Sequence, residues 1–322
     1  MQPLEFQPLL KRIRWGGTRL RSVLDKTIGD ATDAAESWEI ADHGSDQSVV
    51  TQGPLSGWTL TRLVREKSRE LLGRDAGLAQ FPLLIKFLDA HDRLSVQVHP
   101  DNAQVRAAGA HGRGKTEAWV ILDAAPGSRI FAGLKHGVDR ERLAASLELG
   151  RVEECLHSFA ARAGECVYLP AGTVHAIGEG VLLAEIQQTS DVTYRLFDWG
   201  RLGPDGKPRA LHIDQALDCI DYQRGPVNPA LPLQISSEPQ LLEELVRCEY
   251  FILRRHVLSE RMTLEREDRF HILMVVAGQG DLECGGHSWP LVKGRTILIP
   301  AVAPKIQIVP RGEITLLETY LA

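Results

Sequence analysis

The sequence predicts a mainly β protein built from two small β-barrels with helical insertions. Two observations predict this class. Short apolar runs separated by turn residues occupy most of the chain, and one stretch of sequence recurs with the same spacing in the C-terminal part. The length of 322 residues is consistent with about two domains of roughly 150 residues each.

The apolar runs account for the predicted strands, and leucine periodicity accounts for two helical segments. Residues 59–72 and 139–163 repeat leucine and alanine three and four positions apart, which is the spacing of one helix face. The other apolar runs are short and bounded by turn residues, and they predict strands at 83–88, 94–98, 118–122, 167–169, 181–186, 270–276, 296–299 and 314–319. Helices are therefore expected to be a minority.

The recurring stretch has the frame G-x5-P-x-G-x2-H and runs from Gly164 to His175. A glycine turns the chain into a strand, and the proline and second glycine end that strand. The second copy, at 294–305, keeps most of the frame but has Lys305 at the position of His175. We therefore expect a catalytic domain over residues 1–225 and a C-terminal barrel without metal ligands over residues 226–322, divided within the polar stretch 221–233.

Composition argues against several functional classes. The chain carries 37 Lys and Arg against 42 Asp and Glu, a net charge of −5, with no basic patch for nucleic acid or an anionic membrane. No run approaches the roughly 18 apolar residues of a membrane span, and we expect no signal peptide. The five cysteines are widely spaced and form no C-x-x-C pair, so a reducing, cytoplasmic location is expected.

Four polar residues at strand positions are candidates for a metal site. Gln97 and His99 are two residues apart in one predicted strand and so share a face. Glu117 begins another predicted strand, and His175 follows the Pro-Gly corner of a third. Three strands can therefore converge on one divalent cation. Imidazole and carboxylate ligands without thiolate suit Zn²⁺, with Fe, Mn or Co as alternatives.

Most of the eleven histidines need no function, because a single histidine is more often structural or exposed. The set of four differs in two respects. His175 lies on the recurring frame, and strand alternation would bury Gln97 and His99 together, which costs free energy unless both have a partner. We therefore interpret the four residues as ligands of one ion.

Longer stretches resemble one family. The segments PLLIKFLDAHDRLSVQVHPD (82–101), GKTEAW (114–119), PAGTVHAIGEG (170–180) and LLAEIQQTSDVTYRLFDWGR (182–201) resemble type I mannose-6-phosphate isomerases in their short bacterial form. The recurring frame resembles the second motif of the cupin jelly-roll barrels. The resemblance covers the chain from Leu4 to about Tyr222 and is weaker over the C-terminal part.

The resemblance implies an enzyme that interconverts mannose 6-phosphate and fructose 6-phosphate through an enediol. It implies one Zn²⁺ per chain, a small sugar phosphate as the partner, and the metal ligands Gln97, His99, Glu117 and His175. Such a reaction moves a proton between C2 and C1 of the open-chain sugar. A cation near the carbonyl can orient the sugar or act as a Lewis acid, while a positioned base transfers the proton.

Further charged residues near these ligands have roles implied by the same resemblance. Arg195 matches the position of a catalytic arginine, and its guanidinium can hold either the enediolate or the substrate. Lys115 and Asp191 are candidates for catalysis, by substrate contact or proton transfer. Lys86, Lys115 and Glu185 are candidates for substrate binding. The alternative for these charged groups is a layer of structural salt bridges on the barrel wall.

Two other functions fit part of the pattern. Two histidines and one glutamate on Fe(II) would suit a cupin dioxygenase, and a barrel without turnover would suit a sugar-binding or regulatory protein. Cationic groups at Lys115 and Arg195 favour a phosphosugar over the oxygenase substrate. The isomerase is therefore the expected function.

Overall fold

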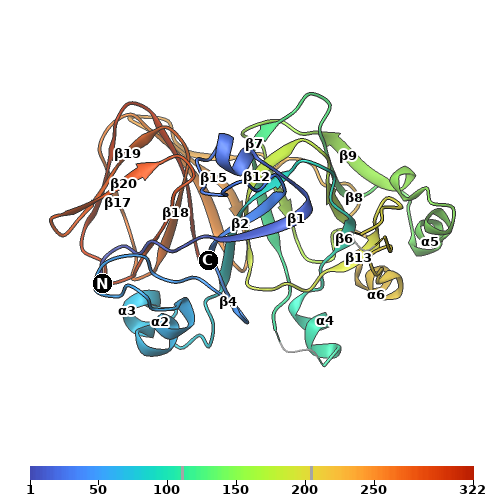
Figure 1. The fold of residues 1–322 in the computed structure, drawn as a ribbon, viewed down its shortest axis with the longest axis horizontal. Coiled ribbons are helices and arrows are strands. Elements are labelled where there is room, and N and C mark those ends of the chain that lie inside the picture. The colour runs from blue at the N-terminus through green and yellow to red at the C-terminus, as the bar shows by residue number, and fades with distance from the viewer. Residues whose placement is uncertain (110–111, 204–205) are drawn as a thin grey trace.

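The computed structural model describes residues 1–109, 112–203 and 206–322. Antiparallel sheets dominate these residues and helices are few, which confirms the mainly β class (Figure 1). None of the sheets in the described part of the chain closes on itself, so each half of the molecule consists of open sheets.

The N-terminal sheet pair consists of a six-stranded and a five-stranded sheet. The six-stranded sheet has the order β1 (Leu9–Gly17), β2 (Ala34–Ile40), β5 (Leu83–Ala90), β12 (Val181–Gln188), β7 (Glu117–Ala124) and β10 (Cys166–Leu169). The five-stranded sheet has the order β13 (Tyr194–Phe197), β6 (Val96–Val98), β11 (His175–Ile177), β8 (Arg129–Leu134) and β9 (Leu156–Ala160).

The C-terminal sheet pair consists of a six-stranded and a four-stranded sheet. The six-stranded sheet has the order β14 (Leu233–Ser236), β15 (Leu241–Arg247), β16 (Ile252–Leu258), β23 (Ile314–Tyr320), β18 (His271–Ala277) and β21 (Thr296–Ile299). The four-stranded sheet has the order β17 (Met262–Leu264), β22 (Ile306–Pro310), β19 (Gln279–Cys284) and β20 (His287–Val292).

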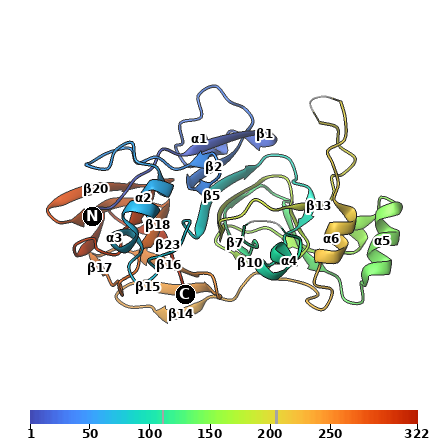
Figure 2. The same ribbon diagram turned by 90° about the horizontal axis from the view of Figure 1, so that it is seen from below.

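The remaining elements are short and lie outside these sheets. The helices are α1 (Arg19–Ser22), α2 (Leu60–Glu66), α3 (Ser68–Leu72), α4 (Asn102–Ala107), α5 (Arg140–Glu148) and α6 (Ile213–Cys219), with a 3₁₀ turn η1 (Val152–Glu154). A two-stranded ribbon joins β3 (Asp42–His43) to β4 (Asp46–Gln47). Figure 2 shows α5 and α6 together at the end of the N-terminal sheet pair, far from the C-terminal sheet pair.

All eight predicted apolar runs coincide with strands, but the second predicted helix is too long. The helix begins after Asp139, whose side chain accepts a hydrogen bond from the Arg142 amide. It ends at Glu148, because Gly150 adopts a φ of 66° that helical residues do not have. The chain then pairs with β8 as strand β9, so the prediction of helix over 139–163 is wrong beyond residue 148.

The sheets stack as four layers, with the two six-stranded sheets in the middle (Figure 1). Side-chain alternation along β12 explains this packing. Leu182 and Ala184 join a core that also holds Ile272 and Leu317 from the C-terminal sheet pair. Leu183, on the opposite face of β12, packs inside the N-terminal sheet pair. The central strands of each six-stranded sheet are therefore buried on both faces, and Glu185 shares the inward face with Leu183.

Among the described residues, no helix combines the length and the apolar character needed to cross a bilayer.

Candidate metal centre

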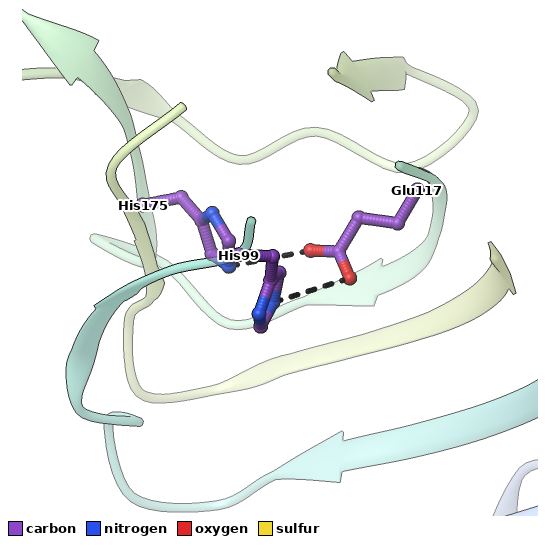
Figure 3. A group of neighbouring side chains, drawn as sticks. All are labelled: His99, Glu117 and His175. Carbon is purple, nitrogen blue, oxygen red and sulfur yellow. Dashed lines mark ion pairs between the residues drawn. The ribbon is translucent and has the colours of Figure 1, made fainter. Parts of the chain in front are cut away.

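Three ligand-type side chains from three strand positions meet between the sheets of the N-terminal pair. His99 directly follows β6, Glu117 begins β7 and His175 begins β11. One ligand atom from each lies within 4.8 Å of the others, and all three residues are buried. Figure 3 shows the Glu117 carboxylate facing both imidazoles. The His/Glu/His part of the predicted ligand set therefore forms a metal-binding triad.

Backbone carbonyls orient both imidazoles. His99 Nδ1 lies 2.9 Å from the carbonyl oxygen of Val192, and His175 Nδ1 lies 2.9 Å from that of Thr173. Because a carbonyl oxygen only accepts, each Nδ1 carries the proton and donates it. The two Nε2 atoms keep their lone pairs and face Glu117. Hydrogen bonds of this kind, from the ring N–H to a backbone carbonyl, orient histidines for metal binding.

The Glu117 carboxylate is the strongest evidence that a cation fits here. Its Oε1 lies 3.2 Å from His175 Nε2 and its Oε2 lies 3.5 Å from His99 Nε2. Among the described residues, neither oxygen accepts a hydrogen bond, and His99 Nε2 has no hydrogen-bond partner either. Buried polar atoms without partners are costly, so converging lone pairs from three residues call for a divalent cation between them.

The electrostatic setting favours neutral imidazole ligands. Burial lowers the pKa of His175 to about 4, and burial together with the charge of Lys115 lowers the pKa of His99 well below its usual value. Burial raises the pKa of Glu117 to about 8, although the Lys115 ammonium, 3.5 Å from Oε2, opposes this rise. A bound cation would shift the Glu117 equilibrium back towards the carboxylate.

Gln97 lies next to the triad in the five-stranded sheet. It is paired in register with His175 on one side and with Arg195 on the other. Its side-chain amide lies 3.4 Å from His175 Nε2. The residue predicted as the fourth ligand therefore lies at the edge of the triad.

A buried chain of charges lines the floor beside the triad. Lys86 Nζ lies 3.0 Å from Glu185 and 3.6 Å from Glu36, and the Trp119 ring N–H donates to Glu185 at 2.9 Å. Burial alone would lower the pKa of Lys86, but Glu185 and Glu36 more than compensate and raise it. Burial alone would raise the pKa of Glu185, and Lys86 reverses this effect and lowers it. Lys86 does not extend to solvent.

These groups border one pocket of about 590 Å³. Among the residues predicted from the sequence, the pocket wall includes Lys86, Gln97, Lys115, Glu185, Asp191 and Arg195. Lys115 is buried, Arg195 is half-buried and Asp191 is exposed at the rim. The charged residues that the sequence singled out therefore line one pocket, and Lys115 connects this pocket to the triad through its contact with Glu117.

Sequence reasoning missed several residues of this pocket. Glu36 and Trp38 alternate along β2 and face Lys86. Their spacing of two residues is a strand signal, but nothing in it specifies which lysine they meet. Arg209 also lines the pocket and comes from a loop, where no periodicity marks its direction.

Comparison with known proteins gives consistent matches. The model of the type I phosphomannose isomerase catalytic domain matches residues 4–118, and the model of the mannose-6-phosphate isomerase cupin domain matches residues 242–320. A mannose-6-phosphate isomerase of Bacillus subtilis is 36% identical over 304 residues, covering 93% of both chains. One from Streptococcus mutans is 36% identical over 300 residues, covering 93% of this chain and 92% of the relative.

Solved structures agree with these matches. The crystal structure of a mannose 6-phosphate isomerase from Bacillus subtilis superposes with a TM-score of 0.92 at 30% identity, covering 100% of both chains. A phosphomannose isomerase variant from Salmonella typhimurium has a TM-score of 0.80 at 18% identity over 100% of both chains, which supports the fold alone. None of these matches supports a dioxygenase or a non-catalytic sugar-binding protein. The chain belongs to the type I mannose-6-phosphate isomerases, which are aldose–ketose isomerases.

Proposed function

We propose that Gln97, His99, Glu117 and His175 hold one Zn²⁺ and that Arg195, Lys115 and Asp191 act with it on mannose 6-phosphate. The observation that supports this ligand set is the pair of unpartnered Glu117 oxygens facing the Nε2 atoms of His99 and His175. Neutral imidazoles, a carboxylate and an amide oxygen, without thiolate, suit zinc. When bound, such an ion polarises the carbonyl and hydroxyl oxygens of the open-chain sugar.

The proton transfer is assigned to residues of this chain. In the direction of the ketose, the proton on C2 is removed and returned at C1, while the O2 hydroxyl proton passes to O1. Lys115 and Asp191 line the pocket, and within the described part of the chain Asp191 makes no hydrogen bond or ion pair. We infer that these two groups accept and return the proton, and that Arg195 stabilises the negative charge that develops on the substrate.

Lys86 and Glu185 are proposed to contact the sugar hydroxyls. Their mutual ion pair keeps Lys86 cationic and Glu185 anionic inside the pocket. A charged donor and a charged acceptor held 3.0 Å apart present fixed hydrogen-bonding groups to a polyol chain. Their role is therefore to orient the sugar, with no change of their own charge.

We infer that each sheet pair is a cupin jelly roll, and that the chain divides into a catalytic domain over residues 1–225 and a C-terminal domain over residues 226–322. The repeated strand order supports both. The five cysteines are all unpaired, which supports a reducing, cytoplasmic location.

A coupled assay that detects fructose 6-phosphate formed from mannose 6-phosphate tests the proposal. Activity should disappear after the purified enzyme is treated with a chelator, and should return when about one equivalent of Zn²⁺ per chain is restored. Arg195→Lys, which retains the charge but loses the planar fork, should lower kcat by about 10- to 100-fold. Full activity in the metal-stripped enzyme would refute the metal-dependent mechanism.

A further inference from the structure

A second cavity, the junction cavity, lies where the N-terminal and C-terminal sheet pairs meet. It has a volume of about 430 Å³ and is bordered by residues of the segments 5–8, 24–27 and 290–296 together with side chains of β2. Pockets of roughly 300–1,000 Å³ between two structural units are common sites for small ligands. The size and the place of the junction cavity are therefore those of a ligand site.

The second copy of the recurring frame forms one wall of the junction cavity. Gly294, the first residue of this copy, has a φ of 84°, and a Cβ there would lie 2.0 Å from the carbonyl oxygen of Leu24. Glycine therefore allows the turn between β20 and β21 to pack against Leu24. This second copy, which has no histidine ligand, thus places Lys293, Arg295 and Thr296 at the cavity.

Strand β2 separates the junction cavity from the pocket beside the triad. Glu36 and Trp38 border that pocket, whereas the alternate residues Ser37 and Glu39 border the junction cavity. Leu10 of β1 borders both spaces. The two spaces therefore lie back to back across the edge of the six-stranded sheet, and a ligand in one does not occupy the other.

Two buried oxygen atoms on the cavity wall lack a hydrogen-bond partner among the described residues. They are Glu5 Oε1 and Thr296 Oγ1, in residues that are 7% and 8% exposed. Arg295 Nε lies 3.1 Å from Glu5 Oε1 without a hydrogen bond to it, while Gln52 donates to Glu5 Oε2 at 2.8 Å. Burial raises the pKa of Glu5, and the charge of Arg295 opposes this rise. Buried polar atoms without partners are costly, so both oxygens favour a ligand that hydrogen-bonds to them.

The formal charges on the cavity wall cancel. The wall contains three acidic and three basic residues, namely Glu5, Asp25, Glu39, Lys26, Lys293 and Arg295. Glu39 already has partners, since Lys26 Nζ lies 2.6 Å from one of its oxygens and Ser37 donates to the other at 2.6 Å. An anion or a cation would therefore meet no excess of opposite charge, and an apolar molecule would leave the unpartnered oxygens without hydrogen bonds.

A neutral polyhydroxylated molecule satisfies these conditions. Each hydroxyl group both donates and accepts, so it can donate to Glu5 Oε1 and exchange a hydrogen bond with Thr296 Oγ1. Within the described part of the chain the ammonium of Lys293 has no hydrogen bond or ion pair, so it is available to a hydroxyl oxygen. Phe6 and Leu24 border the same cavity, where they can contact the C–H groups of a sugar ring.

We propose that the junction cavity is a second ligand site, which binds a neutral polyhydroxylated molecule of about the size of a monosaccharide through Glu5, Thr296 and Lys293. The cavity is smaller than the pocket of about 590 Å³ beside the triad, which limits the size of its ligand. This site is separate from the metal centre, so its occupancy does not depend on the proposed function. A ligand held there contacts both sheet pairs and should stabilise the folded chain.

Three neutral probes test the site, namely methyl α-glucopyranoside, methyl α-mannopyranoside and myo-inositol. Each is titrated into the metal-loaded enzyme and followed by saturation-transfer NMR. None of the three can open to an aldose, so none is a substrate of the isomerase. At least one should bind with a dissociation constant of roughly 0.1–10 mM and raise the unfolding temperature. If none binds, water alone fills the cavity and the assignment is overturned.

Substitutions locate the bound probe. Thr296→Val keeps the shape of the side chain without the hydroxyl and should raise the dissociation constant by about 3- to 10-fold, whereas Thr296→Ser keeps the hydroxyl and should stay within about twofold of wild type. Glu5→Gln removes the charged acceptor and should weaken binding by about 10-fold, which provides a second variant if Thr296→Val is unstable. The unfolding temperature of each variant without probe is the folding control.

His175→Ala distinguishes the two spaces. Because the triad lies apart from the junction cavity, this variant should bind the probe within about twofold of wild type. Loss of probe binding in His175→Ala would place the probe in the catalytic pocket. Wild-type affinity in both Thr296→Val and Glu5→Gln would place it elsewhere on the molecule. Either result would refute the second site.

Discussion

The N- and C-terminal sheet pairs have charged side chains at equivalent positions of their six-stranded sheets. In the order β5-β12-β7-β10, Lys86 pairs in register with Glu185, and Glu117 pairs with Leu169. In the order β16-β23-β18-β21, Arg254 pairs with Glu318, and His271 pairs with Ile299. Leu169 and Ile299 both precede the proline of the recurring frame. The duplication therefore extends from the strand order to the inward-facing polar residues.

The two sheet pairs differ in how they satisfy the buried carboxylate. Glu318 accepts hydrogen bonds from His271 Nδ1 at 2.6 Å and from His256 Nε2 at 2.7 Å, so protein donors satisfy both its oxygens. Within the described part of the chain, neither oxygen of Glu117 has such a donor. The position of His175 is taken in the C-terminal sheet pair by Lys305, which is exposed.

This difference indicates why the N-terminal sheet pair holds a candidate metal centre, whereas the buried carboxylate of the C-terminal sheet pair has a structural role. A buried carboxylate and the cation opposite it can both lie on one sheet, and both sheet pairs have such residues on their six-stranded sheet. A metal-binding triad also needs ligands from the smaller sheet, and only His99 and His175 provide these among the residues that the structure describes. In the C-terminal network both oxygens of the buried carboxylate have protein donors, and His271 Nε2 is the atom of that His–Glu–His group that lacks a partner among the described residues.

The largest expected effect comes from removing a ligand of the N-terminal triad. His175→Ala should abolish stoichiometric zinc binding and lower kcat/KM by about a thousandfold or more, because the charge stabilisation that a metal supplies amounts to several kcal/mol. The zinc content and the coupled assay measure these losses. His256→Ala, the matched change beside Glu318, should retain zinc and keep kcat/KM within about twofold. A similar loss of zinc in both variants would contradict the division between the two pairs.

A smaller effect, on stability, is expected when Lys86 or Arg254 is replaced. These two cations occupy equivalent positions of the two six-stranded sheets. Lys86→Met leaves the buried Glu185 and the partly buried Glu36 without their ammonium partner and should lower the free energy of unfolding by about 3 kcal/mol or more. Arg254→Met should cost less than about 1 kcal/mol. Its side chain is 26% exposed and its contact with Glu244 is a long 3.5 Å, so solvent screens the pair. Urea unfolding of both metal-free variants measures the contrast, and equal losses would refute it.

The smallest expected effect is the loss, at acidic pH, of the stabilisation that Glu318 provides. Burial alone would raise its pKa, but the hydrogen bonds from His256 and His271 lower it to about 2, below the ordinary 4.5. A lowered folded-state pKa means that this stabilisation is present above about pH 4.5 and is lost as the pH falls towards 2. Glu318→Gln should therefore cost about 1–3 kcal/mol at pH 7 and progressively less towards pH 3, measured by urea unfolding at each pH. A cost that grows on acidification would reverse the predicted sign.

Much of the fold was predictable from local patterns. The apolar runs and turn residues place strands correctly because a buried strand needs a continuous run of apolar side chains. The helix prediction failed at residues 149–160. The helical spacing of leucine and alanine continues past Gly150, and this local pattern does not show that β9 pairs with β8. Polar edge strands such as β1 were also missed, since one exposed face weakens the apolar signal.

The sequence by itself determined the repeat and the triad residues, because each lies on a strand period or a turn frame that local chemistry dictates. The charged positions Lys115, Asp191 and Arg195 were identified through the resemblance to the family. Tertiary structure alone decided that Lys86 meets Glu36, that Asp198 holds Arg209, and that Val192 and Thr173 carbonyls fix the imidazoles. Those contacts depend on strand order and on the paths of loops, which no local spacing specifies. The physical reason is that register across neighbouring strands is set by packing of the whole sheet.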